Sequence, residues 1–228
     1  MKKLFISIII VMINLSLYAQ STIEKASQLF YKGYLINSPD HFIAGIKLLD
    51  EHSAKNNETM LLLGRGYLGL LNQSVALDDD DIYDDHEDAA KEHFNKMIEN
   101  SALAGIGYAM LGSAISLEIA HSPMKGMILG PKSSSYLEKA MKADDKSPDV
   151  WAKNADSKYF TPESFGGSKI LAMDYYRKAI EKFEATGDTQ NWLYLDALAW
   201  LGQAYASVGE DEKALATFQK ALRHEPAF

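Results

Sequence analysis

The sequence predicts an all-α protein, an array of antiparallel helix pairs with about ten helices in all. One observation is that apolar residues recur at helical spacing through most of the chain after residue 21. The other is a short pattern in which Leu-Gly is followed three residues later by a large side chain, found at Leu63-Gly64, Leu111-Gly112 and Leu201-Gly202. Because one helix pair cannot bury its own apolar face, repeated copies of it predict a stack.

Residues 1–19 differ from everything that follows. The basic start at Lys2 and Lys3 is followed by an apolar run over residues 4–17 and by small or polar residues around Ala19. This is the layout of a secretory signal peptide, and a run of about 14 apolar residues is too short to span a bilayer. We therefore expect export, cleavage near Ala19, and a periplasmic or secreted protein of a bacterial envelope. A retained N-terminal anchor is the alternative.

The composition of the chain limits the classes of partner that we expect. The chain has 228 residues and no cysteine, so stability must come from a packed core and not from disulfides. Its net charge is −8, and −10 once Lys2 and Lys3 are removed. Because an acidic surface repels phosphate backbones, we expect no nucleic acid partner. No later apolar run is long enough for membrane insertion of the mature chain.

The first three helix pairs follow in order. Residues 22–35 and 41–55 form the first pair, with Ser38-Pro39-Asp40 as the start of its second helix. Residues 57–71 and 88–99 form the next, with an aspartate-rich insertion over 76–87 between them. The third pair is expected at residues 102–120 and 133–143, and its connection, residues 121–132, contains Pro123 and Pro131.

Two further pairs complete the chain. The fourth starts at Ser147-Pro148-Asp149, with proline at the first helical position, and its second helix runs to Phe183. The fifth spans residues 195–226 and turns at Val208-Gly209-Glu210. The predicted units after the signal peptide, within one repeat domain over residues 20–228, are approximately 22–55, 57–99, 102–144, 147–184 and 192–228.

The last pair carries a family resemblance. Leu201-Gly202-x-x-Tyr205, then Ala214-x-x-x-Phe218-x-x-Ala221 and Pro226, resembles the tetratricopeptide repeat (TPR). The copies upstream lie farther apart than the usual period of about 34 residues, so the related Sel1-like repeat stays an alternative. The resemblance implies a right-handed α-solenoid that binds a protein or peptide in a concave groove lined by the first helix of each pair.

The same resemblance points to groove residues. In the family, the residue two positions after the leucine of Leu-Gly is exposed in the groove. The resemblance implies that the corresponding residues here are Arg65, Ser113, Asp156 and Gln203. Positions two residues before the leucine are mostly small and apolar, namely Leu61, Ala109, Ala152 and Ala199. This composition disfavours the lysine and asparagine clamp with which some family members hold a C-terminal carboxylate.

Two local patterns have a chemical and a structural interpretation. Gly64 to Gly69 spells G-x-G-x-x-G, which binds dinucleotides only between a strand and a helix. Since the residues before it have helical spacing, we interpret the glycines as helix-packing positions.

The acidic run Asp78–Asp88 has oxygen ligands for calcium, but it lacks the glycine and distant glutamate of a calcium-binding loop. A solvated acidic loop that caps the next helix is favoured, and calcium binding stays open.

No set of acid, base and nucleophile is apparent, so we expect no enzyme, cofactor or metal site. The main functional hypothesis is an exported, non-enzymatic scaffold for a protein or peptide partner. The alternative is a periplasmic helical repeat protein that binds a small ligand beside a solute transport system. For that ligand we single out one aromatic and glycine-rich loop, with Tyr159, Phe160, Phe165, Gly166 and Gly167.

The C-terminal helix pair also raises the question of self-association. No further helix follows to cover it, and Leu215 and Leu222 are candidates for an apolar face left open. A homo-oligomer through this pair is therefore a further expectation.

Overall fold

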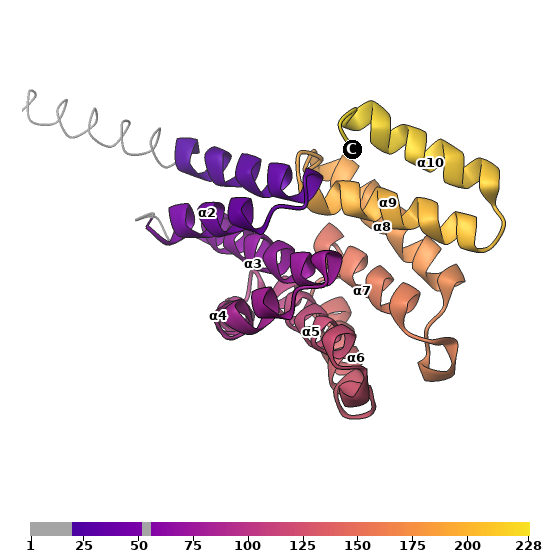
Figure 1. Cartoon of the computed structure of the whole chain (residues 1–228), viewed down its shortest axis with the longest axis horizontal. Helices are drawn as coiled ribbons and strands as arrows, with labels where there is room; N and C mark the ends of the chain where they lie inside the picture. Colours follow the sequence, from indigo (N-terminus) through magenta and orange to yellow (C-terminus); the bar gives the residue numbers. More distant parts are fainter. Residues whose placement is uncertain (1–19, 52–55) are drawn as a thin grey trace, which may run out of the picture.

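The structure, a computed structural model, describes residues 20–51 and 56–228, so the predicted signal peptide lies outside the described residues. The described chain is all-helical and contains no strand (Figure 1). No helix in these ranges is long and apolar enough to cross a membrane. Residues 20–35 form the first helix, followed by α2 (Pro39–Asp50), α3 (Asn57–Leu77), α4 (Asp80–Glu99), α5 (Ala104–His121), α6 (Gly126–Ala143), α7 (Pro148–Phe160), α8 (Lys169–Thr186), α9 (Trp192–Ser207) and α10 (Asp211–His224). Two short 3-10 helices, η1 (Pro123–Lys125) and η2 (Glu163–Phe165), precede α6 and α8.

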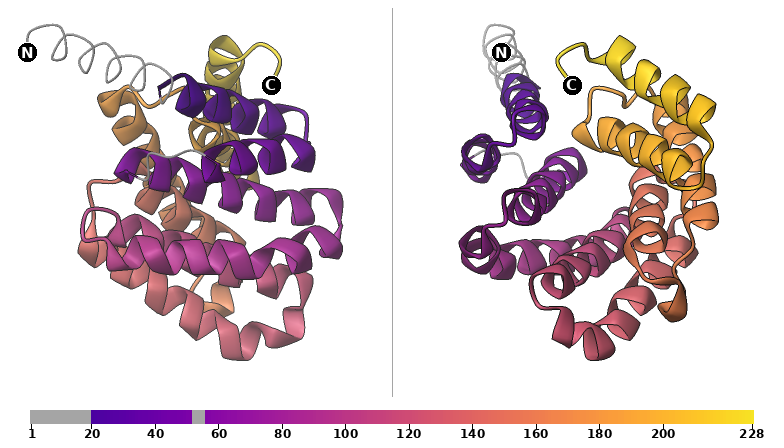
Figure 2. Two further views of the ribbon diagram at one scale, coloured as in Figure 1. Left: turned by 90° about the vertical axis from the view of Figure 1, so that its left-hand side faces the viewer. Right: turned by 45° about the vertical axis from the view of Figure 1, so that its right-hand side comes forward.

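These helices form a right-handed α-solenoid of antiparallel pairs. Each first helix packs on its partner, as α5 does on α6 and α7 on α8, and first helices also contact the next first helix along the array. The first helices α3, α5, α7 and α9 therefore line the inner side of the curved array. The curve is tight enough that the C-terminal end of the chain, after α10, lies beside the first helix (Figure 2).

Local sequence sets where the helices begin and end. The Asn56 side chain accepts a hydrogen bond from the Thr59 N–H (2.9 Å), which caps α3. Pro148 starts α7 in the position where its missing N–H costs nothing, and the Ser147 hydroxyl caps the same helix. Gly187 ends α8 with a left-handed φ of 74°, a conformation that glycine adopts without strain.

Two helices begin earlier than the sequence suggests. Helix α4 starts at Asp80 and not near Asp88, because the Asp79 side chain caps it and the carboxylates of its first turn favour a helix N-terminus. The predicted acidic loop is therefore mostly helix. Helix α6 starts at Gly126 and not at residue 133, and Pro131 lies inside it, where it removes one backbone hydrogen bond near the N-terminal end.

The glycines of α3 are packing positions. A methyl group at Gly66 would overlap the Phe30 ring, and one at Gly69 would overlap Phe42. These two rings are fully buried and stacked, with centroids 5.7 Å apart. The G-x-G-x-x-G pattern thus lies within one helix and seats the aromatic rings of the first helix pair, without the strand that a dinucleotide site requires.

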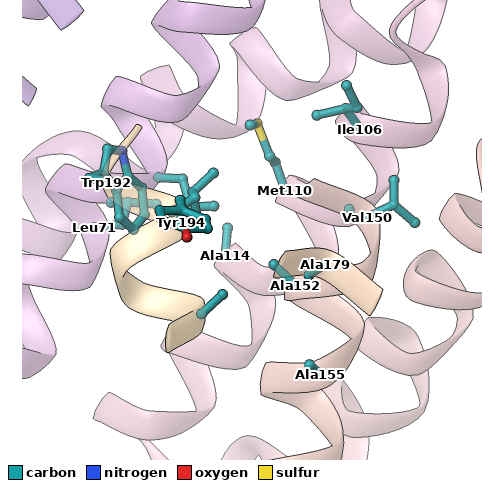
Figure 3. Packing of buried hydrophobic residues seen from close by; sticks show 14 of the residues in the cluster. Leu71, Ile106, Met110, Ala114, Val150, Ala152, Ala155, Ala179, Trp192 and Tyr194 are labelled. Carbon is teal, nitrogen blue, oxygen red and sulfur yellow. The ribbon is translucent and has the colours of Figure 1, made fainter. Parts of the chain in front are cut away.

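The core runs continuously along the array. Fully buried alanines such as Ala114 and Ala155 let neighbouring helices approach closely, while Met110 and Val150 fill the space between them (Figure 3). Each pair therefore shares its core with the next one.

Contacts between distant parts of the sequence close the array. Tyr34, at the end of the first helix, lies against Trp192 of α9 with ring centroids 5.5 Å apart and against Phe228 at 6.1 Å. Phe42 of α2 meets the same Trp192 ring edge-on at 6.2 Å. The first helix pair is thus joined to the last one, which an open solenoid does not do.

Candidate functional site

A group of buried charges lies where the first helices face one another. Arg65 of α3 donates to both carboxylate oxygens of Asp149, at 2.8 and 2.7 Å, and to Asp188 at 2.7 Å. Burial lowers the pKa of Arg65, but the carboxylates of Asp149 and Asp188 more than offset this and raise it above its ordinary value. A bidentate pair of this kind is the strongest form of arginine–carboxylate contact. It connects α3 to α7, 84 residues later in the chain.

A second buried cation belongs to the same group. The Lys153 ammonium lies 2.6 Å from Asp156 and 3.7 Å from Asp196, and 5.6 Å from the centre of the Trp192 ring. Burial lowers the pKa of Lys153, while Asp156 and Asp196 raise it, and the net shift is upward. Lys153 is therefore charged at neutral pH in spite of its burial.

Hydroxyl and indole donors complete the arrangement around the carboxylates. Asp196 accepts hydrogen bonds from the Tyr34 hydroxyl (3.2 Å) and the Trp200 N–H (3.1 Å), and Asp156 accepts one from Tyr176 (2.7 Å). Burial raises the pKa of Asp196 to about 6, against the opposing effect of Lys153. We call this set the inner polar network, made of Arg65, Asp149, Lys153, Asp156, Asp188 and Asp196.

The inner polar network is built to hold the array together. It joins α3, α7 and α9 and, through Tyr34, the first helix, and most of its polar groups already have partners inside the protein. Buried charges arranged in this way are costly to separate. In the described part of the chain, no group of three or more histidine, aspartate or glutamate side chains is placed to hold a metal ion.

An aromatic cluster lies beside the network at the end of α7. The Phe160 ring centroid is 4.6 Å from that of Trp200 on α9, and Tyr159 lies 5.0 Å from Phe160 and 5.4 Å from Trp200. The Lys169 ammonium lies 5.7 Å from the centre of the Tyr159 ring. Phe160 is 57% exposed, which is high for a large apolar side chain in contact with two other rings. We call Tyr159, Phe160 and Trp200 the aromatic shelf.

The loop after the shelf is fixed by its glycines. Gly166 has a φ of 91°, and a side chain at Gly167 would overlap the Thr161 carbonyl group. The Lys158 ammonium donates to the Gly166 carbonyl (3.1 Å), and the Lys158 carbonyl accepts from the Ser168 N–H (2.8 Å). This folded-back loop leaves Phe165 73% exposed.

The four predicted groove residues have different surroundings. Arg65 and Asp156 both belong to the inner polar network, where their side chains are already paired. Ser113 on α5 is half-buried and Gln203 on α9 is exposed. Of these four residues, Gln203 is the one most open to a partner.

Four residues of the network, Asp149, Lys153, Asp188 and Asp196, and Trp200 of the shelf were not predicted from the sequence. Asp196 stands alone in the apolar stretch WLYLDALAWL, and that isolated charge is a signal for a buried polar contact. Asp149, Lys153 and Asp156 recur at helical spacing on α7, which also points to one charged helix face. Asp188 and Trp200 had no comparable signal.

Other predicted features lie elsewhere on the molecule. Asp80, in the acidic run, pairs with His121, whose other ring nitrogen lies 2.7 Å from the Ser74 hydroxyl. Leu215 and Leu222 are exposed on α10, so an apolar strip is present where self-association was predicted.

The last helix pair relates the chain to known proteins. Residues 195–228 match the family model of the tetratricopeptide repeat. The fold is TPR-like. The HusA haemophore from Porphyromonas gingivalis is structurally similar, with a TM-score of 0.63 and 17% identity over 83% of this chain and 94% of the haemophore. So is TTC0263, a thermophilic TPR protein of Thermus thermophilus, with a TM-score of 0.57 and 19% identity over 91% of this chain and 92% of that one. No curated protein matches the chain.

Proposed function

We propose that this TPR-like protein is an exported, non-enzymatic scaffold that binds a protein or peptide partner on its inner side, with the aromatic shelf as the anchor. The observation that carries the proposal is Phe160, which is 57% exposed although it packs on Trp200 and Tyr159. Aromatic side chains held rigidly at a surface are the commonest anchors of protein interfaces.

The inner polar network supports this position for the partner. Because Arg65 and Lys153 already pair with carboxylates of the same chain, a charged partner group would have to displace buried ion pairs. The shelf and the exposed Gln203 can be covered without breaking such pairs. A partner matches these surfaces if it presents an apolar or aromatic side chain to the shelf and, next to it, a group that can form a hydrogen bond with the Gln203 side-chain amide.

A photo-crosslinking amino acid in place of Phe160 tests the proposal. In cells that make the protein, it is expected to capture a defined partner. The same amino acid in place of Leu215, which is 59% exposed on α10, is expected to capture at most a second copy of the chain and not that partner. The partner, identified by mass spectrometry and purified, should bind Phe160→Ala about tenfold or more weakly than the parent. Leu215→Ala is the matched control, and equal binding by both variants contradicts the proposal.

A planar small ligand is the second candidate, favoured by the similarity to a haemophore over 94% of that chain. Porphyrin rings stack on aromatic side chains, and the shelf presents three of these at one place. Titration with haemin, followed by its Soret absorption, distinguishes this candidate. Saturable binding at one equivalent that is weakened by Phe160→Ala and not by Leu215→Ala supports a haem-like ligand, and a linear, variant-independent absorption change contradicts it.

A further inference from the structure

The second helix of the fourth pair, α8, presents an apolar face to the pair that follows. Met173 and Ile180 lie on this face, two helical turns apart, and they are only 8% and 4% exposed. Helix α9 of the fifth pair packs on α8, and Tyr205 of α9 lines the same small pocket as Met173. The face is therefore buried because the next helix covers it.

Helix α10 has the equivalent face, but here it is exposed. In the repeat pattern, Leu215 and Leu222 correspond to those two residues of α8, because each of the four follows a buried alanine. Leu215 and Leu222 are nevertheless 59% and 47% exposed. Among α2 to α9, helix α10 packs mainly on α9, and it lies at the outer edge of the array (Figure 1). This face of α10 thus has the composition of a surface that receives another helix.

The two leucines belong to a longer exposed strip of α10. Its residues recur at spacings of three and four, which places them on one side of the helix. They are Glu212, Leu215, Ala216, Gln219, Leu222 and Arg223, and all six are exposed. We call these six residues the α10 strip. The small side chain of Ala216, near the middle of the strip, allows another helix to approach closely.

The two ends of the α10 strip carry opposite charges. Glu212 lies in the first turn of the helix, next to Asp211, and Arg223 lies in the last turn. In residues 20–51 and 56–228, neither Glu212 nor Arg223 takes part in an ion pair. The neighbouring charges are already bonded inside the chain: the two lysines of α10 to carboxylates, His224 to a backbone carbonyl group and Glu225 to a tyrosine hydroxyl. A partner for this strip therefore needs a basic group at one end and an acidic group at the other.

We propose that the α10 strip binds the α10 strip of a second copy of this chain, with the two helices antiparallel across a two-fold axis near their middle. This arrangement places Glu212 of each copy opposite Arg223 of the other, and it covers Leu215 and Leu222 of both copies. A parallel pair would instead bring like charges together at both ends. The strip is thus complementary to itself in the antiparallel orientation, as a closed two-fold contact requires.

The size of the strip sets the expected strength of the contact. Helix α10 has 14 residues and is about 21 Å long, and the strip is one helix wide. A contact of this size buries less than about 1,200 Å² in total, which is the class of weak and reversible complexes. We expect a dissociation constant on the order of 10 µM. The contact does not depend on the aromatic shelf, none of whose residues lies on α10.

Sedimentation equilibrium over a range of protein concentrations tests the proposal. The chain beginning at Gln20 is used, because the apolar run before it can cause association by itself, and the core described above lies within residues 23–221. Circular dichroism verifies that this chain is folded. Between about 1 and about 300 µM, its mean mass is expected to rise from that of a monomer toward that of a dimer and no further.

A double leucine variant tests the apolar part of the contact. Leu215→Ser with Leu222→Ser is expected to raise the dissociation constant by about tenfold or more, since the two-fold axis makes it remove four apolar side chains from one interface. Met127→Ser with Ile128→Ser is the matched control. These two side chains are 84% and 80% exposed on α6, so non-specific apolar association would depend on them more strongly. The control should dimerise like the parent.

Charge reversal tests the antiparallel orientation. Glu212→Arg alone and Arg223→Glu alone should each weaken the dimer by about fivefold or more at low salt, because the two-fold axis then brings like charges together at both ends. The double variant with both reversals restores opposite charges at each end and should dimerise like the parent. In a parallel pair, by contrast, neither single reversal would change the like-charge contacts.

Four outcomes overturn the proposal. The first is a parent chain that stays monomeric at every concentration, and the second is equal loss of association in the leucine and control variants. The third is a double reversal that dimerises as weakly as the single ones. The fourth is an assembly that grows beyond a dimer, since a two-fold contact is closed.

Discussion

At the scale of single residues, buried charge is the main feature that separates this protein from a purely apolar helix array. Arg65 and Lys153 are both buried, and each lies against carboxylates contributed by other helices or other turns. A buried ion pair adds little stability by itself, but removing one partner leaves the other uncompensated in a medium of low dielectric constant.

Arg65→Ala is expected to lower the free energy of unfolding by about 3–5 kcal/mol, because Asp149 would remain buried without its bidentate partner. Urea denaturation followed by far-UV circular dichroism measures the loss. Lys96→Ala, which removes an exposed pair with Glu92, is the control and should leave the midpoint unchanged. If the two variants have equal midpoints, the Arg65 pairs do not stabilise the fold.

Asp196 is expected to make stability depend on pH. Its pKa is about 6 in the folded chain against 3.8 as the ordinary value, so the folded state binds its proton more tightly than the unfolded state. The stability that this contributes is present below about pH 4 and is lost as pH rises to about 6, at about 1.4 kcal/mol per unit. The neighbouring groups that set this pKa are Lys153, Asp156, Tyr34 and Trp200.

Asp196→Asn isolates the effect, since an amide does not titrate. The unfolding free energy of the parent minus that of the variant should fall between about pH 4 and about pH 6 and stay level above about pH 7. Urea titrations of both proteins at several pH values measure this difference. A difference that is constant over the whole range would rule out Asp196 as the titrating group.

At the scale of elements, glycine positions decide how closely helices approach. Phe30 and Phe42 occupy the space that side chains at Gly66 and Gly69 would fill, so the first helix pair lies directly on α3. Here the aromatic rings come from one pair and the glycines from the next. The interface thus depends on a match between two repeats, and not on the helix propensity of either one.

Gly69→Ala is therefore expected to destabilise the protein by about 1–3 kcal/mol, since the added methyl group would overlap the buried Phe42 ring. This loss would exceed the gain of up to about 1 kcal/mol that alanine brings to a helix interior. Gly126→Ala in α6 is the control, where the nearest atom would lie at an ordinary 3.4 Å. In thermal melts, the midpoint temperature of Gly69→Ala should fall below that of the parent, and the midpoint of Gly126→Ala should not fall. A midpoint for Gly69→Ala above that of the parent would show that the Phe42 ring can move aside without cost.

At the scale of the whole molecule, closure changes how the array should unfold. Open solenoids are stabilised by contacts between nearest neighbours, and their cooperativity can break down along the array. Here Tyr34 contacts Trp192, Asp196 and Phe228, which couples the first helix pair to the last. We expect one cooperative transition for the complete chain.

Tyr34→Ala is expected to break this cooperativity. The tryptophans at 151, 192 and 200 report on the C-terminal half, whereas far-UV circular dichroism reports on all helices. The two signals should give coincident urea transitions in the parent and separated ones in the variant. Tyr34→Phe keeps the ring contacts without the hydroxyl group and should stay coincident, and separated transitions in the parent would contradict the role of closure.

The sequence predicted the helix array because its signals are local. Leu201, Gly202 and Tyr205 specify one helix–helix contact by their spacing, and the family match covers that same pair. The start of α4 was predicted too late because a run of aspartates resembles a loop until its role at a helix N-terminus is recognised. The inner polar network depends on residues up to 123 positions apart, as for Arg65 and Asp188, and no local spacing specifies such a contact.

Closure has a consequence for how this protein can evolve. An open solenoid can gain or lose a repeat by duplication, because each unit needs only a matching neighbour. In this chain an extra unit inserted between α4 and α7 would move Tyr34 away from Trp192 and Asp196, and Arg65 away from Asp149, at the same time. The number of repeats is therefore constrained by geometry. We expect changes in length among its descendants to be confined to the turns, where residues can be added without altering the curvature of the array.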